Sequence, residues 1–432
     1  MLRVPAFAAL LILAAAAAPA GAQPAAIPDP VISTAPRTPA PPPPEAPPPI
    51  APAQPVEVTA LAAPDAFTTP ARATGLPPTL WRGTSLQVVR AVLPLLADKP
   101  LSPAAAALAR RVLATGAPGP EGAGQDPALV AGRAAALIGQ GDPRAAAAIL
   151  ARAPGLDRNP DLARVAAESA LLAGEDARAC AIESALTAGR DDLYWVRLRT
   201  YCQAVGGHAA EAQLTFEVAQ SQGKDAAFTR LMAAKLAGAG DPGAPSLRNG
   251  LDYALSRNLG LDLSQAKPAP AVAGALAQGA PAEPAFDLAA APPELAGAVQ
   301  AIAAGGPFAT VELERLLDAA DTRDPKARAR ASAAALIAEA FAEPLGPTLR
   351  ARIAALATPE GKAPAGRNLA LEAAGSERRG GETALLALWT CAEAGPAGPM
   401  VGDRARIVRA LRRAGLDADA RAFALEGLSS LK

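Results

Sequence analysis

The stretch that decides the fold reads ALIGQGDPRA at residues 136–145 and ALLAGEDARA at residues 170–179, so the two segments begin 34 residues apart. A third copy, CQAVGGHAAEA, occupies residues 202–212, and a shortened fourth, LAGAGDP, occupies residues 236–242. The steps from Asp176 to His208 and from His208 to Asp241 are 32 and 33 residues. A period near 34 residues with a turn between two helices is typical of a helix–turn–helix solenoid.

These segments resemble the tetratricopeptide-like superfamily of helical repeats. The shared features are small residues before the turn, a glycine at its start and an alanine early in the second helix, namely Ala145, Ala179 and Ala212. Glycine accepts the backbone of the turn, and alanine lets the second helix lie close to the first. The resemblance covers residues 126–259, and the Trp, Tyr and Pro positions of the full pattern are mostly not met. It implies a repeat architecture and carries over no functional residue.

The composition extends the helical interpretation to the whole chain. Hydrophobic residues make up 51% of the 432 residues but aromatic residues only 3%, so alanine and leucine must fill the core. Alanine has the highest helix propensity, whereas the β-branched and aromatic residues that strands prefer are sparse. We therefore predict an all-α protein in which helix–turn–helix repeats form an α-solenoid, preceded by a disordered proline-rich linker.

The N-terminal residues have the pattern of a secretory signal peptide. Arg3 supplies a positive charge, residues 10–18 are apolar, and Ala20-Gly21-Ala22 fits the small-residue cleavage pattern. Cleavage there would make Gln23 the first mature residue and place the protein in the periplasm or outside the cell. The alternative is an uncleaved segment that anchors the chain in the inner membrane.

Five segments follow from these patterns: a signal peptide at 1–22, a disordered proline-rich linker at 23–80, tetratricopeptide-like repeats at 81–265, an Ala/Pro/Gly-rich loop or hinge at 266–293, and a second helical region at 294–432. The linker contains four consecutive prolines at 41–44 and three at 47–49, and proline fixes φ and lacks an N–H donor. We expect order to begin near Trp81.

The three cysteines bear on the compartment, because disulfides persist in oxidising environments. Cys180 and Cys202 lie at similar distances on either side of a predicted turn near residues 189–191, between two successive helices. Residues equidistant from a hairpin turn face each other, so we predict a disulfide between them. Two buried free thiols are the alternative. Cys391 has no obvious partner and is interpreted as a small core residue.

Several classes of function are disfavoured by the sequence. The formal net charge is zero and no basic stripe stands out, which argues against nucleic-acid binding. His208 is the single histidine, which removes most zinc sites and most histidine-based acid–base chemistry. We find no phosphate-binding glycine loop, paired-histidine motif or serine nucleophile elbow. We therefore predict no catalytic residues, no metal and no cofactor, and a protein that is not an enzyme.

The richest local chemistry lies in DDLYWVRLRTY at residues 191–201. Tyr194, Arg197 and Tyr201 follow at steps of three and four, which places them on one helix face, where Tyr and Arg are typical of binding hot spots. We predict these three residues as a binding site. The competing interpretation is that the aromatic residues fill gaps between alanine-rich helices.

The repeats, the linker and the missing catalytic motifs together predict a non-enzymatic periplasmic protein that mediates protein–protein interaction or envelope assembly, because a helical-repeat body offers a large binding surface. Its partners would be proteins of a bacterial envelope. The alternative is an accessory subunit or binding protein in peptidoglycan metabolism. No nucleic-acid partner is expected, and membrane attachment is expected only if the signal peptide remains uncleaved.

Overall fold

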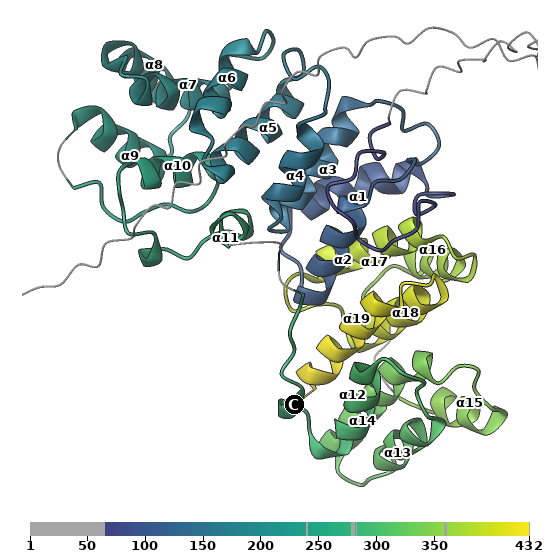
Figure 1. Cartoon of the computed structure of the whole chain (residues 1–432). Helices are drawn as coiled ribbons and strands as arrows, with labels where there is room; N and C mark the ends of the chain where they lie inside the picture. Colours follow the sequence, from purple (N-terminus) through teal and green to yellow (C-terminus); the bar gives the residue numbers. More distant parts are fainter. Residues whose placement is uncertain (1–64, 239–240, 278–280, 282, 358–360, 432) are drawn as a thin grey trace, which may run out of the picture. The chain divides into compact units, whose positions relative to one another are not determined.

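The structure is a computed structural model that describes residues 65–238, 241–277, 281, 283–357 and 361–431. The predicted signal peptide and the proline runs of the linker lie outside these residues. The described residues form nineteen α-helices and four short 3-10 helices and contain no strand (Figure 1), so the prediction of an all-α protein is confirmed.

Many of the helices begin at proline, which suits the first turn because an N–H there has no partner within the helix. The first ten helices are α1 (Leu86–Asp98), α2 (Pro103–Ala114), α3 (Pro127–Gly139), α4 (Pro143–Leu150), α5 (Pro160–Ala173), α6 (Asp176–Ala185), α7 (Leu193–Val205), α8 (Ala209–Gln222), α9 (Ala226–Ala237) and α10 (Gly250–Asn258).

The stretch 266–293 contains one α-helix, α11 (Pro270–Leu276). Eight more follow it: α12 (Ala296–Ala304), α13 (Thr310–Ala320), α14 (Pro325–Ala338), α15 (Pro347–Ala354), α16 (Ala365–Ser376), α17 (Gly380–Ala394), α18 (Val401–Arg413) and α19 (Asp417–Ser430). The 3-10 helices are η1 (Leu263–Gln265), η2 (Leu288–Ala290), η3 (Pro293–Leu295) and η4 (Glu339–Phe341).

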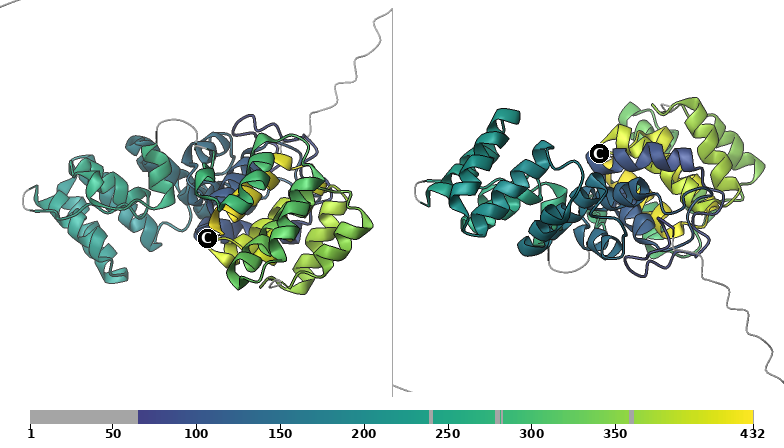
Figure 2. Two further views of the ribbon diagram at one scale, coloured as in Figure 1. Left: turned by 90° about the horizontal axis from the view of Figure 1, so that it is seen from below. Right: turned by 90° about the horizontal axis from the view of Figure 1, so that it is seen from above.

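The larger hydrophobic core joins helices from both ends of the described chain. Helix α1 packs on α17, and α2 packs on both α17 and α19, as Figures 1 and 2 show by the contact of blue and yellow helices. Leu108, Leu385 and Phe423 are fully buried in this core, and most of its other members are alanine or leucine. Small side chains let the helices pack closely, as the composition predicts.

A second hydrophobic core is formed mainly by α5–α10. Its largest members are Trp195, Tyr201, Phe216 and Phe228. Helices α5 and α6 pack together, as do α7 and α8, and α10 returns to pack against α5. The aromatic residues are divided between the two cores, because Phe67, Trp81 and Phe423 belong to the larger one.

The repeated sequence corresponds to three helical hairpins, α3–α4, α5–α6 and α7–α8, each with its two helices in contact. The turns contain Gly141, Gly174 and Gly207, whose φ angles are +80°, +79° and +84°. Only glycine adopts this left-handed conformation without steric cost. Each of these glycines directly precedes the N-cap residue of the second helix, which explains why the repeat keeps a glycine in its turn.

Described residues that precede Trp81 already pack into the larger core. Phe67 is fully buried with its ring centroid 4.9 Å from that of Trp81. The Asp65 carboxylate shapes the turn before it by accepting hydrogen bonds from the backbone N–H groups of Phe67 and Thr68, at 2.7 and 2.9 Å. The sequence does not predict this packing, because a single phenylalanine among Pro and Ala residues makes no periodic pattern.

Cys180 on α6 and Cys202 on α7 form the predicted disulfide, with their Cα atoms 5.5 Å apart. Cys391 is a buried free thiol, and burial raises its pKa to about 12. Among the described residues, no helix has both the length and the hydropathy that a membrane span requires.

Candidate binding site

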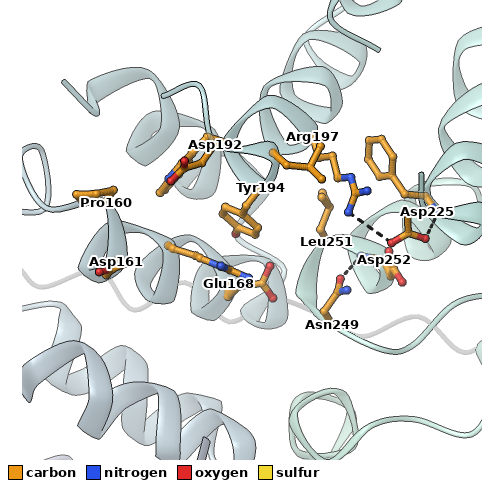
Figure 3. A pocket seen from close by; sticks show the side chains of 14 residues that line it. Pro160, Asp161, Glu168, Asp192, Tyr194, Arg197, Asp225, Asn249, Leu251 and Asp252 are labelled. Atoms are coloured by element: carbon orange, nitrogen blue, oxygen red, sulfur yellow. Dashed lines mark hydrogen bonds and ion pairs between the residues drawn. The ribbon is translucent and has the colours of Figure 1, made fainter. Parts of the chain in front are cut away.

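A polar cavity of about 570 Å³ lies where the first turns of α5, α7, α9 and α10 meet (Figure 3). The local sequence determines each helix start. Asn159 caps α5 by accepting from Leu162 N at 3.1 Å, and Asn249 caps α10 by accepting from Asp252 N at 2.8 Å. Asp225 caps α9 by accepting from Phe228 N at 3.2 Å.

Four aspartates lie at these helix starts: Asp161, Asp192, Asp225 and Asp252. The N-terminus of a helix carries a partial positive charge, so an acidic residue in the first turn is stabilising. This explains why the cavity is rich in carboxylates. Asp192 occupies the N-cap position of α7, but its side chain makes no capping hydrogen bond there.

On one side of the cavity, the carboxylates are paired with arginine. Arg248 donates to Asp225 at 2.8 and 3.0 Å and to Asp252 at 2.7 Å, and Arg197 lies 3.5 Å from Asp225. Partial burial would raise the pKa of Asp225, but the hydrogen bonds from Arg248 and Phe228 N and the two arginine charges lower it overall. This side is electrostatically satisfied.

The other side is formed by Tyr194, Glu168 and Arg164. The half-buried Glu168 carboxylate accepts one hydrogen bond, from Gly250 N at 2.7 Å. The Arg164 guanidinium lies over the Tyr194 ring, 4.8 Å from its centroid. The Tyr194 hydroxyl is buried on the Glu168 side of the cavity without meeting hydrogen-bond geometry to any described residue (Figure 3).

Burial is the main influence on the titration of these groups. Burial raises the pKa of the Glu168 carboxyl, although the hydrogen bond from Gly250 N, the adjacent Tyr194 hydroxyl and the charge of Arg164 act against this. Burial and the charge of Glu168 raise the pKa of Tyr194 well above its usual value. A nearby positive charge would stabilise the ionised carboxylate.

Two of the three predicted site residues line this cavity. Tyr194 and Arg197 do so, whereas Tyr201 is fully buried in the second core beside the ion pair of Asp176 and Arg257. Burial and the charge of Asp176 raise the pKa of Tyr201 above its ordinary range. Arg197 stacks on the Phe228 ring with its guanidinium carbon 5.3 Å from the centroid, and it donates to Gly223 O at 3.1 Å.

Sequence reasoning did not bring Arg164, Asp225 and Asp252 to this site. Arg164 lies on α5, far in the sequence from the starts of α9 and α10 where the two aspartates lie, and the return of α10 to α5 brings them together. Glu168 is one of many carboxylates on predicted helices, and its local sequence does not distinguish it from the others. One signal was available: each of the four aspartates begins a helical pattern.

No protein-family model matches the sequence, and the comparisons with curated proteins and with solved structures return no match. The fold and the cavity define an all-α protein of helices packed on their neighbours, compatible with a helical repeat, with a disulfide between α6 and α7 and a polar cavity at four helix starts.

Proposed function

We propose that this protein is a non-enzymatic helical-repeat protein of a bacterial envelope that binds a partner protein through the cavity at the starts of α5, α7, α9 and α10. The observation that carries the proposal is a cavity on packed helices whose wall includes a buried tyrosine hydroxyl that meets hydrogen-bond geometry to none of the described residues. Buried polar groups are normally paired, so such a group favours contact with a ligand.

The disulfide supports the proposed compartment. Cys180 and Cys202 are joined within one chain, and such bonds form in oxidising compartments such as the periplasm. Together with the signal pattern at 1–22, this supports a periplasmic or secreted protein. Inner-membrane anchoring through the same segment is the alternative.

The tetratricopeptide-like architecture is part of the same proposal. Its support is the three hairpins α3–α4, α5–α6 and α7–α8, with a left-handed glycine in each turn. The arrangement departs from a regular stack where α10 packs on α5, which closes the second core. In this proposal the departure creates the cavity, because it brings a fourth helix start into place.

The test is a crosslinking pull-down of the tagged full-length protein from envelope extract, read by mass spectrometry. We expect a reproducible partner protein that is reduced in a Tyr194→Ala variant and retained in a Leu214→Ala variant, because Leu214 is exposed on α8 and does not line the cavity. Recovery of no specific protein would refute the proposal. Retention on purified peptidoglycan sacculi without a protein partner would favour the cell-wall alternative.

A further inference from the structure

We propose that the cavity binds the cationic side chain of a lysine or arginine from the partner protein, held over the Tyr194 ring and beside the Glu168 carboxylate. This inference rests on the proposed function and specifies the chemistry of the partner. The argument follows from the distribution of charge, from the position of Arg164 and from the unpaired Tyr194 hydroxyl.

The cavity wall carries an excess of negative charge. Its charged groups comprise five carboxylates and two guanidinium groups, on Asp161, Glu168, Asp192, Asp225, Asp252, Arg164 and Arg197. Arg248 and Arg197 pair with Asp225, and Arg248 also pairs with Asp252. Among the described residues, the remaining three carboxylates form no ion pair, and Arg164 is the one cavity-lining cation on their side. A cationic ligand would complement this side.

Arg164 marks where a cation lies in this cavity. Its guanidinium is stacked on Tyr194 and its charge acts on Glu168, although it forms no hydrogen bond or ion pair with the described residues. The residue is exposed and one helical turn from Asp161, so it can move outward at little cost. The chain thus presents an aromatic face beside a carboxylate, the combination that attracts ammonium and guanidinium groups.

The Tyr194 hydroxyl supplies the second polar contact. It is buried near the Glu168 carboxylate without meeting hydrogen-bond geometry to any described residue, and Figure 3 shows both groups on the same side of the cavity. A hydroxyl oxygen accepts hydrogen bonds, and an ammonium or guanidinium group only donates them. A lysine or arginine between the two residues would therefore pair with the carboxylate and donate to the hydroxyl.

One argument favours an anionic ligand instead, because helix N-termini attract anions. Here, however, each of the four helices already has an aspartate in its first turn or at its N-cap. These carboxylates already interact with the partial positive charges at the helix N-termini. An anionic ligand would have to approach Asp161 and Asp192, which are exposed and unpaired.

The experiment is a titration of the full-length protein with a fluorescein-labelled peptide of alternating glycine and lysine, followed by fluorescence anisotropy. Controls are the same peptide with acetylated lysines and a peptide of alternating glycine and glutamate. We expect the lysine peptide to bind about tenfold more tightly than the acetylated one at low salt, and this preference to shrink as salt is added. Equal binding of the first two peptides would overturn the inference.

Two variants separate a cation site from an anion site. Glu168→Gln removes the charge but keeps an oxygen that can accept from Gly250 N, and we expect it to weaken lysine-peptide binding about tenfold. Arg164→Gln removes the internal cation, and we expect it to strengthen binding several-fold. Glu217→Gln, exposed on α8 and absent from the cavity wall, is the matched control and should change nothing.

Arg164→Gln decides the matter even if Glu168→Gln impairs folding, because Arg164 is exposed. Weaker binding of the lysine peptide by Arg164→Gln, or tighter binding of the glutamate peptide than of the lysine peptide, would overturn the inference. A partner protein recovered equally by the wild type and Glu168→Gln would overturn the cation site while leaving the proposed function in place. Recovery of no partner by the wild type would refute the proposed function, whereas the peptide titration would still decide the charge preference.

Discussion

The fully buried guanidinium of Arg133 on α3 makes no carboxylate ion pair with the described residues and instead donates to three backbone carbonyl oxygens. The acceptors are Leu113 O at 2.7 Å, Thr115 O at 2.9 Å and Ala66 O at 3.1 Å. The guanidinium carbon also lies 5.5 Å from the centroid of the Phe67 ring. This one side chain therefore ties the first described residues to the end of α2.

Arg133→Met removes the buried charge at this position, whereas Arg133→Lys keeps it. Losing three hydrogen bonds from a charged donor costs about 6 kcal/mol. Burial lowers the pKa of Arg133 from 12.5 to about 9, so removing the charge recovers about 5 kcal/mol. We therefore expect Arg133→Met to lose about 1 kcal/mol. Arg133→Lys keeps a buried charge and reaches about one of the three oxygens, so we expect it to lose about 4 kcal/mol.

The measurement is the free energy of unfolding from chemical denaturation, followed by far-ultraviolet circular dichroism and tryptophan fluorescence. Arg152→Lys, on an exposed residue, is the control and should leave stability unchanged. Both Arg133 variants should also expose Arg72 to limited trypsin digestion, because the segment at 65–74 loses its anchor. The reasoning is refuted if the lysine variant is as stable as the wild type or more stable than the methionine variant.

Three further predictions concern the two cores. Replacing Cys180 and Cys202 by serine should reduce the free energy of unfolding of the second core by about 3 kcal/mol, from the loop entropy for a separation of 22 residues, and hydrogen exchange in α5–α10 would show it; unchanged exchange would contradict this. Glu426→Gln should cost about 3 kcal/mol in thermal or chemical unfolding, because it leaves the buried Arg404, 2.7 Å away, without a counter-charge; a neutral effect would contradict this. Burial raises the pKa of Asp419 to about 6 despite the charge of Arg111, so the native state holds an extra proton between about pH 4 and pH 6, and the free energy of unfolding should fall as pH rises through that window, by up to about 3 kcal/mol. Asp419→Asn should flatten this dependence, and an unchanged slope would exclude Asp419 as its source.

The helices could be predicted because their signals are local. Alanine-rich periodic stretches, prolines at first turns and glycines in the repeated turns each act within a few residues. The disulfide was predictable for the same reason, because Cys180 and Cys202 are equidistant from one turn and lie on consecutive helices. These features depend on the chain over one or two helices and not on its long-range packing.

The long-range arrangement could not be predicted in this way. The contact of α2 with α19 includes a buried network in which Glu426 accepts from Ser102 Oγ at 2.9 Å and from Ala104 N at 2.8 Å. Ser102 occupies the N-cap position of α2 but makes no capping bond itself, and Glu426 from the far end of the chain satisfies the helix instead. No local pattern reports that a cap will come from a residue more than 300 positions away.

The candidate site shows the same division between local and long-range information. An aspartate at a helix start is predicted to cap that helix, and Asp225 does so through Ala227 N and Phe228 N. Asp192 occupies the equivalent place on α7 and makes no such bond, which leaves its carboxylate available at the cavity rim. The sequence alone cannot distinguish these two aspartates, because the difference is whether the side chain turns toward its own helix. Packing therefore decides which carboxylate at a helix start lines the cavity without capping its own helix.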